Sequence, residues 1–304
     1  MQDKRAHGVI PALVTPFTKS GEVDIAGLQN LVAYVVEGGV HGVFANSSTG
    51  EYNNIGKREQ RTVVEVVHDM VQDLIPVFVN ASALSVRDGI ENGKKVADWG
   101  ADFAVYTPPF YYKYSQAELV KFFTLIADEV PVPVMIYNHV SLKNVLELPA
   151  ILELADHPNI VGLKDTTVNM RGFLSTVTAL QDKPGFSLFQ GTEGLFSPSV
   201  VFGGHGGVLA LACVAPKLFC AIYEARQDPK QCLALELKVQ RLLQILSIAG
   251  DYGQSINNFL MSIHTALAAL DICRAKPSQL ADELPNESNI AKVNKILVDV
   301  GVLE

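Results

Sequence analysis

The feature that most constrains this chain is a repeated alternation between two kinds of segment, which begins near Gly8 and continues to about Ala212. Short apolar runs rich in β-branched residues have the composition of buried strands, and the longer stretches between them have apolar residues spaced as on one face of a helix. The eight expected strands are Val9–Thr15, Gly42–Asn46, Pro76–Asn80, Phe103–Thr107, Val132–Asn138, Ile160–Lys164, Phe186–Gln190 and Gly207–Leu211.

Amphipathic segments between these runs predict helices, and the pattern after Pro216 is helical only. The clearest helices between strands are expected at Asp24–Glu37, Lys57–Gln72, Val86–Trp99, Gln116–Glu129, Leu148–Ala155 and Arg171–Gln181. In the last third they are expected at Ala234–Ile248, Ser255–Leu270 and Asn289–Val300.

Apolar strands that alternate with helices predict a parallel sheet covered on both faces. Eight such units suit a closed (β/α)8 TIM barrel, and a doubly wound sheet is the alternative. The barrel is favoured because the 304 residues contain no break in composition and no Gly/Ser/Pro-rich linker. We expect residues 1–215 to carry the barrel up to strand eight. Residues 216–304 should form the last barrel helix and a C-terminal helical extension of the same structural unit.

Composition and charge exclude several classes of protein. With 48% hydrophobic and 18% charged residues the chain can bury a large core. A net charge of −8 without any Lys/Arg run argues against nucleic acid as a partner, and no run of 18 apolar residues suggests a membrane partner. The cysteines lack CxxC spacing and are expected to be buried free thiols in a reducing compartment, so a cytoplasmic location is expected; they are Cys213, Cys220, Cys232 and Cys273.

Lys164 is the sharpest candidate for chemistry, because it closes the apolar strand Ile160–Lys164. Catalytic residues of such barrels lie at the carboxyl ends of the strands. Burial of a lysine lowers its pKa, and a neutral amine is a nucleophile toward carbonyl groups. The alternative is a lysine that reaches solvent or pairs with Asp165.

Two other strand ends carry polar groups toward the same mouth. Tyr137 could relay protons to a reacting carbonyl, or it could simply cap the core as an amphipathic aromatic residue. Ser48, Thr49 and Gly50 offer hydroxyl and backbone N–H groups that could hold a carboxylate, or they could form an ordinary turn between strand and helix.

The sequence contains no signature of a metal or an organic cofactor, and none is expected. The seven histidines show neither HxH nor HExxH spacing. Neither GxxxxGK[ST] nor, after the first strand, GxGxxG occurs, and GxSxG is absent. The glycine cluster at 203–207 precedes strand eight and is interpreted as a tight turn.

Taken together, the strand ends resemble the dihydrodipicolinate synthase/N-acetylneuraminate lyase family of pyruvate-dependent Schiff-base aldolases. The resemblance covers nearly the whole chain and rests on seven motifs in family order: GVIPALVTPF, NSSTGE, YTPPFYYK, IYN, GLKDT, QGTE and GGHGGVLALA. It implies a (β/α)8 barrel with a C-terminal helical extension, usually assembled as a homotetramer.

The resemblance also implies roles for individual residues. Lys164 matches the lysine that forms the Schiff base, Tyr137 the tyrosine that shuttles protons, and Ser48 the hydroxyl of the proton relay. Tyr111 matches the tyrosine that completes this relay, often from a neighbouring subunit. The implied substrate-binding residues are Ser48, Thr49, Gly50, Thr192, Glu193 and Leu209. Apart from the resemblance, we expect His139 to help Thr192 and Glu193 to select the tail of the substrate.

Two departures from the family pattern bear on the substrate. Ser47 stands where most members have glycine, and the usual proline and arginine after YN are missing. In dihydrodipicolinate synthases that arginine holds the second substrate's carboxylate, and Leu142 cannot do so. We therefore expect a lyase that acts on pyruvate or a 2-oxo-3-deoxy sugar acid, with an aldehyde as partner. Dihydrodipicolinate synthase, with aspartate semialdehyde, and a non-catalytic 2-oxo-acid-binding homologue are the alternatives.

Overall fold

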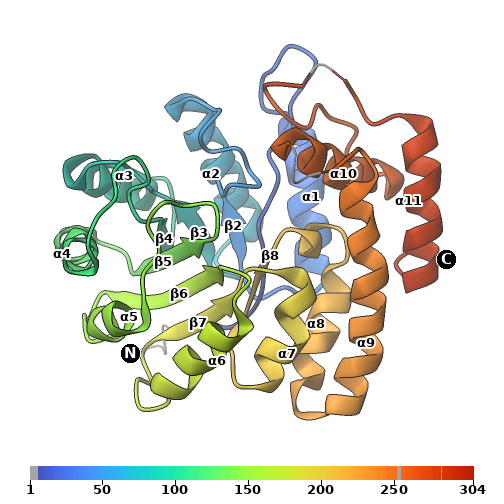
Figure 1. The fold of residues 1–304 in the computed structure, drawn as a ribbon. Coiled ribbons are helices and arrows are strands. Elements are labelled where there is room, and N and C mark those ends of the chain that lie inside the picture. Colours follow the sequence, from blue (N-terminus) through green and yellow to red (C-terminus); the bar gives the residue numbers. More distant parts are fainter. Residues whose placement is uncertain (1–5, 252–254, 282) are drawn as a thin grey trace.

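The computed structural model describes residues 6–251, 255–281 and 283–304, and its eight parallel strands form a barrel surrounded by helices (Figure 1). The strand order is β1-β8-β7-β6-β5-β4-β3-β2, and a parallel bridge between Ala12 and Phe44 links β1 to β2. The predicted (β/α)8 barrel is confirmed. The strands are β1 (Gly8–Pro11), β2 (Val43–Ala45), β3 (Val77–Asn80), β4 (Phe103–Tyr106), β5 (Val134–His139), β6 (Ile160–Thr166), β7 (Ser187–Gln190) and β8 (Gly206–Leu209).

Helices follow the strands in the predicted order, and each predicted helix is present. The observed helices, including α7, for which no range was predicted, are α1 (Ile25–Glu37), α2 (Lys57–Val71), α3 (Val86–Asp98), α4 (Gln116–Ala127), α5 (Leu148–Leu154), α6 (Met170–Ala179), α7 (Phe196–Val201), α8 (Pro216–Glu224), α9 (Pro229–Leu242), α10 (Ile256–Ala269) and α11 (Glu287–Val300). Short 3₁₀ segments are η1 (Glu193–Leu195), η2 (Leu211–Cys213), η3 (Ala225–Gln227) and η4 (Leu243–Ser247).

The ninth helix differs most from its predicted range. It begins earlier, at Pro229, because the Asp228 side chain accepts hydrogen bonds from the amides of Lys230 and Gln231 and caps the first turn. It also ends earlier, at Leu242, where the backbone tightens into η4. The predicted helix at Ala234–Ile248 therefore spans two elements.

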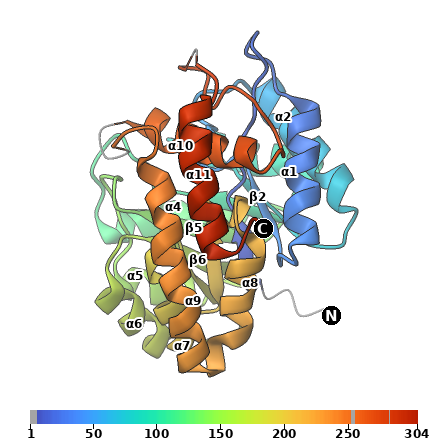
Figure 2. The same cartoon turned by 90° about the vertical axis from the view of Figure 1, so that its right-hand side faces the viewer.

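The C-terminal extension consists of α9, η4, α10 and α11. Helix α11 lies beside α9, and α10 packs against α11 and η4 (Figure 2). A hydrogen-bonded contact ties the segment before α11 to the loop after β2. The Glu51 carboxylate accepts a hydrogen bond of 2.7 Å from the Ser278 hydroxyl and one of 3.1 Å from the Gln279 amide. Residues more than 200 positions apart are thus joined beside the carboxyl end of the barrel.

Two hydrophobic cores hold the fold together. The smaller one fills the barrel with inward-facing residues such as Phe44, Phe78 and Phe189. The larger one lies between strands and helices, and it includes Val35 of α1 as well as Val239 of α9 and Val293 of α11. Because this core runs through both parts of the chain, we propose to treat residues 1–215 and 216–304 as one structural unit.

The four cysteines are free and buried, as predicted. Within the described part of the chain, no helix is both long and apolar enough to cross a lipid bilayer. The predicted tight turn before strand eight is also present: Gly203 has φ +102°, and β8 approaches β1 so closely that a Cβ atom at Gly206 would collide with the Gly8 carbonyl oxygen.

Candidate functional site

A cavity of about 490 Å³ opens at the carboxyl ends of the barrel strands. Residues from the strand ends form its base, and residues from η4 and α10 form part of its wall. Its lining comprises Ala12, Ser48, Thr49, Tyr137, His139, Val140, Ser141, Lys164, Thr166, Val168, Gly191, Thr192, Glu193, Val208, Ala210, Leu246, Ile256 and Phe259.

Lys164 projects from β6 into the base of this cavity and is 5% exposed. Its Nζ atom lies 4.2 Å from the ring centroid of Tyr137 and 5.4 Å from that of Phe44. Among the described residues no carboxylate forms an ion pair with it, and Asp165 instead accepts a hydrogen bond from the Thr167 amide. Burial lowers the pKa of Lys164 to about 7, and Glu193 offsets this by less. A large fraction of the amine is therefore neutral at pH 7.

Tyr137 stands next to Lys164, because β5 and β6 pair with these two residues in register. Its phenol is buried, and burial raises its pKa to about 12. The hydroxyl groups of Ser48 and Thr166 lower this pKa, but by less than burial raises it. A protonated phenol beside a neutral amine can donate a proton at the atom where a carbonyl would react.

The loop after β2 brings Ser48 and Thr49 to the cavity wall. Ser47 is buried, and its hydroxyl accepts a hydrogen bond from the Gly50 amide. The Ser47 hydroxyl therefore stabilises the loop. The amides of Ser48 and Thr49 have no partner in the described part of the chain and can serve as donors to an anion.

His139 lines the cavity two residues beyond Tyr137, and the two rings meet edge to face at 5.7 Å. Its Nδ1 atom accepts a hydrogen bond of 3.0 Å from the Ser141 amide, so a neutral ring carries its proton on Nε2. Burial, with a smaller effect of Lys164, lowers the pKa of His139. The imidazole is thus a neutral polar group at the cavity wall.

Thr192 and Glu193 reach the cavity from the loop after β7. The Glu193 carboxylate is bound to the amides of Ala210 and Leu211, at 2.8 and 3.1 Å, and so fixes the end of β8. The Thr192 hydroxyl is buried and has no partner among the described residues. It is available to a bound molecule.

Three predicted residues lie elsewhere. Leu209 packs outward among the helices, while its neighbours Val208 and Ala210 line the cavity. Gly50 lies behind the wall, where its carbonyl accepts a hydrogen bond from Thr15. Tyr111 is 65% exposed on the loop after β4 and contacts Tyr112. In this single chain it does not reach the cavity.

Several lining residues were not predicted. Thr166 could have been found, because it lies two residues after Lys164 on the same face of β6. Leu246, Ile256 and Phe259 could not, since they arrive through the packing of the extension and no local pattern marks them. Neither Leu142 nor Lys143 lines the cavity, and the Lys143 amine donates to the Tyr111 carbonyl at 2.8 Å.

In the residues that the structure describes, no group of three His, Cys, Asp or Glu side chains is arranged to hold a metal ion. The prediction that the protein uses no metal and no cofactor stays a prediction.

Comparison with known proteins is consistent with this arrangement. Residues 5–297 match the model of a family described as the dihydrodipicolinate synthetase family. An uncharacterized DapA-like lyase of Thermococcus kodakarensis is 30% identical over 82% of this chain and 87% of its own length.

Two relatives of known structure are similar throughout. YagE of Escherichia coli K12, provisionally named a 2-dehydro-3-deoxy-D-gluconate aldolase, is 32% identical over 78% of this chain and 80% of its own length. Its structure in complex with pyruvate has a TM-score of 0.87 and covers 98% of this chain and 99% of that one, at 25% identity. Dihydrodipicolinate synthase of Bacteroides thetaiotaomicron has a TM-score of 0.88 at 30% identity, with coverages of 97% and 98%.

Proposed function

Because this chain belongs to the dihydrodipicolinate synthetase family and is a lyase of that family, we propose that it forms an imine between Lys164 and a 2-oxo acid. The substrate is pyruvate or a 2-oxo-3-deoxy sugar acid. One observation carries the proposal: the Lys164 amine, with its pKa lowered to about 7, lies beside the Tyr137 phenol at the base of the cavity.

The chemistry follows from these two groups. The neutral amine attacks the C2 carbonyl carbon, and the resulting carbinolamine loses water to give a protonated imine. That imine withdraws electrons from C3, so the C3–C4 bond breaks with release of an aldehyde and leaves an enamine. Protonation at C3 and hydrolysis then return pyruvate and the free lysine. In condensation the same steps run in reverse.

The surrounding residues orient the substrate and move its protons. Tyr137 donates a proton during loss of water and exchanges one with the aldehyde oxygen. The Ser48 hydroxyl connects the phenol to the mouth of the cavity, and the free amides of Ser48 and Thr49 hold the carboxylate.

The wall of the cavity supports a hydroxylated tail on the second substrate. The polar groups beyond Lys164 are the neutral His139 imidazole and the hydroxyls of Ser141, Thr166 and Thr192. Lys164 is the one lysine or arginine in the described lining, and Glu193 contributes negative charge. A second carboxylate, as in aspartate semialdehyde, would lack a cationic partner, so the dihydrodipicolinate synthase alternative is less well supported.

We also propose a cytoplasmic homotetramer. The four free cysteines support a reducing compartment. The loop after β4 exposes Phe110, Tyr111 and Tyr112, and Tyr111 could complete a proton relay only in a neighbouring subunit. Analytical ultracentrifugation of wild type and Tyr111→Ala tests this assembly.

Borohydride reduction in the presence of pyruvate tests the proposed function. We expect one lysine, Lys164, to acquire a stable secondary amine, identified by peptide mapping. The Lys164→Met variant should acquire no label on any lysine. A label on another lysine, or none at millimolar pyruvate, would refute the mechanism. Pyruvate binding without any label would favour the non-catalytic alternative.

An assay of cleavage and condensation substrates tests the second substrate. We expect cleavage of 2-oxo-3-deoxy sugar acids to pyruvate and an aldehyde, and poor condensation of pyruvate with aspartate semialdehyde, since one missing charged hydrogen bond costs about 1.5–3 kcal/mol. A kcat/KM of ~10⁴ M⁻¹s⁻¹ or more for pyruvate plus aspartate semialdehyde would restore the synthase.

A further inference from the structure

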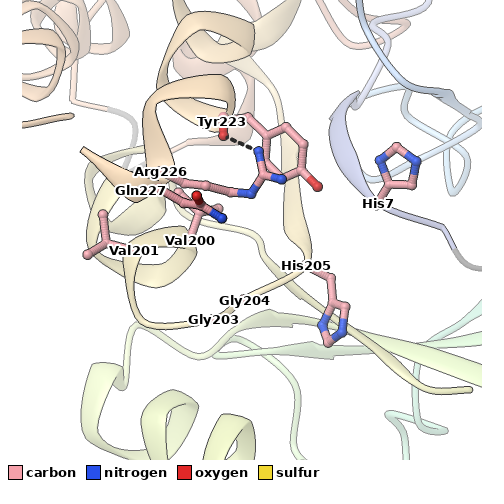
Figure 3. Close-up of a pocket in the computed structure, with 9 residues that line it drawn as sticks. All are labelled: His7, Val200, Val201, Gly203, Gly204, His205, Tyr223, Arg226 and Gln227. Atoms are coloured by element: carbon pink, nitrogen blue, oxygen red, sulfur yellow. Dashed lines mark hydrogen bonds between the residues drawn. The ribbon is translucent and has the colours of Figure 1, made fainter. Parts of the chain in front are cut away.

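A second cavity lies at the opposite end of the barrel, and the proposed chemistry does not use it. Its volume is about 570 Å³. Figure 3 shows the residues that line it. His7 immediately precedes β1 and His205 immediately precedes β8, so both mark the amino ends of the strands, whereas Lys164 lies at the carboxyl ends. The remaining lining residues are Val200, Val201, Gly203, Gly204, Tyr223, Arg226 and Gln227.

Aromatic contacts build one wall of this amino-end pocket. The Arg226 guanidinium lies 4.3 Å from the ring centroid of Tyr223. The His41 ring, behind the lining, meets Tyr223 at 5.1 Å and His7 at 5.3 Å. Gly8 has φ +80°, and a Cβ atom there would collide with the His41 ring, so the backbone is shaped to admit this imidazole.

The charge of the pocket is one-sided. Its described lining contains one arginine and two histidines and no carboxylate. Arg226 donates from one nitrogen to the Tyr223 carbonyl, at 2.8 Å, and forms no ion pair with a described carboxylate (Figure 3). A guanidinium has five N–H donors in a planar fork, so several remain for a ligand. Two acidic residues close to Arg226 in sequence, Glu224 and Asp228, are outside the lining. Glu224 acts on His41, and the Asp228 side chain accepts hydrogen bonds from the first amides of α9.

The loop amides cannot hold the ligand themselves. Those of Gly203, Gly204 and His205 all donate to backbone carbonyls, at 3.2, 2.8 and 2.9 Å. Recognition must therefore come from side chains. Arg226 suits bidentate binding of an oxyanion, and the Gln227 amide suits a hydroxyl or carbonyl group on the same molecule.

We propose that this amino-end pocket binds a small organic molecule that carries a phosphate or carboxylate group, with Arg226 as its main contact. A bare phosphate ion would fill only a fraction of the volume, which favours an organic ligand. The site is separate from the Lys164 cavity and does not depend on the reaction assigned to that cavity.

Calorimetric titration at constant ionic strength tests the proposal, with glycerol 3-phosphate, citrate and inorganic phosphate as probes. The Lys164→Met variant serves as the starting protein, because it removes the cation of the other cavity. We expect one saturable site per chain for glycerol 3-phosphate or citrate, and the stronger of the two identifies the group recognised. Inorganic phosphate that binds as tightly as both would overturn the organic part of the proposal.

Variants assign the binding to the pocket. Arg226→Gln should weaken binding at least about tenfold, since a charge-assisted bidentate pair is lost. Arg87→Gln, on the exposed face of α3, should leave it unchanged. His205→Asn keeps an acceptor for the Leu188 amide, which now donates to His205 Nδ1 at 3.0 Å, and should weaken binding without loss of fold.

Thermal unfolding of each free variant shows whether the fold is intact. The proposal would be refuted if neither glycerol 3-phosphate nor citrate showed saturable binding to the starting protein at concentrations up to about 10 mM, which would detect even weak binding. The proposal would also be refuted if the folded Arg226→Gln and His205→Asn variants bound the probes as tightly as the starting protein does.

Discussion

The lowered pKa of Lys164 follows from its surroundings, because the side chain is buried and no described carboxylate forms an ion pair with it. The faces of Tyr137 and Phe44 cover the amine, and the cavity base admits little water around it. A cation over an aromatic face gains some electrostatic energy, which offsets part of the cost of burial. Burial still dominates and lowers the pKa to about 7.

The pH dependence of trapping follows from this value. Imine formation needs the neutral amine, so its rate at subsaturating pyruvate should rise with pH up to about 7 and then level off, with about a tenth of the maximal rate at pH 6. Borohydride trapping in a rapid-quench instrument measures it. A free lysine side chain, with a pKa of about 10.4, is the control. A rate that still rises tenfold per unit above pH 8 would contradict the lowered pKa.

Tyr137→Phe removes only the phenolic hydroxyl. We expect turnover to fall by about 10²–10⁴-fold, the usual contribution of a general acid or base. The matched control is Tyr106→Phe: Tyr106 is also a buried strand tyrosine, but its hydroxyl donates to the Gly89 carbonyl, at 2.9 Å. That variant should lose stability and keep its turnover. Similar turnover in both variants would leave Tyr137 with a structural role only.

Much of the site could be predicted at the scale of residues, since a polar side chain that closes an apolar strand must lie at the barrel mouth. Lys164 and Tyr137 are of this kind, and Thr49 lies in the loop that follows β2 at the same mouth. Leu209 was misplaced because successive strand residues face opposite sides, and nothing in GGVLALA fixes which of them faces inward. The structure resolves this through the pairing of β8 with β1, which turns Val208 inward.

At the scale of elements, the loops after the strands decide what the cavity presents. Asn138 shows how a motif residue serves this purpose: its side chain donates to the Leu146 carbonyl and accepts from the Leu146 amide, each at 3.0 Å. The loop between β5 and α5 is thereby fixed against the strand. His139 and Ser141, which begin this loop, are held at the cavity wall.

Val168 gives the loop after β6 a strained backbone, with φ +61° in a β-branched residue. Val168→Asn should raise the free energy of unfolding by about 1 kcal/mol, because asparagine tolerates the left-handed conformation. Val140→Asn is the control, since Val140 is equally exposed on the same rim and does not have a positive φ. Urea unfolding measures both. A gain in the control, or none at Val168, would contradict the strain.

The strands and most helices could be predicted because their hydrophobic periods are strong and local. Helix α7 has only six residues, too few to display a period, and it escaped prediction. The first and last residues of α9 are set by the Asp228 cap and by the 3₁₀ turn at η4, and hydrophobic periodicity reveals neither feature.

At the scale of the whole molecule, the extension contributes directly to the cavity at the carboxyl end of the barrel. Leu246, Ile256 and Phe259 add an apolar wall to a cavity whose base comes from the strands. The Glu51 carboxylate holds the two parts together through Ser278 and Gln279. Loss of this contact should therefore weaken the whole fold and not only one loop.

A double-mutant cycle tests this coupling. Glu51→Gln keeps the size of the side chain but removes its charge, and we expect a loss of about 1–3 kcal/mol, since the carboxylate is buried and accepts hydrogen bonds from Ser278, Gln279 and Asn54. Ser278→Ala should cost about 0.5–1.5 kcal/mol. Because both substitutions remove the same hydrogen bond, the double variant should lose less than the sum of the two.

Urea unfolding supplies the four free energies, and labelling of Lys164 with pyruvate and borohydride shows that each variant retains its site. Coupling of about 0.5 kcal/mol or more is expected for residues in direct contact. Strict additivity would mean that the segment before α11 is stabilised independently of the barrel. A single transition in all four proteins, with coupling, would instead support one structural unit formed by the barrel and the extension, in which the extension cannot leave the barrel without loss of the cavity wall.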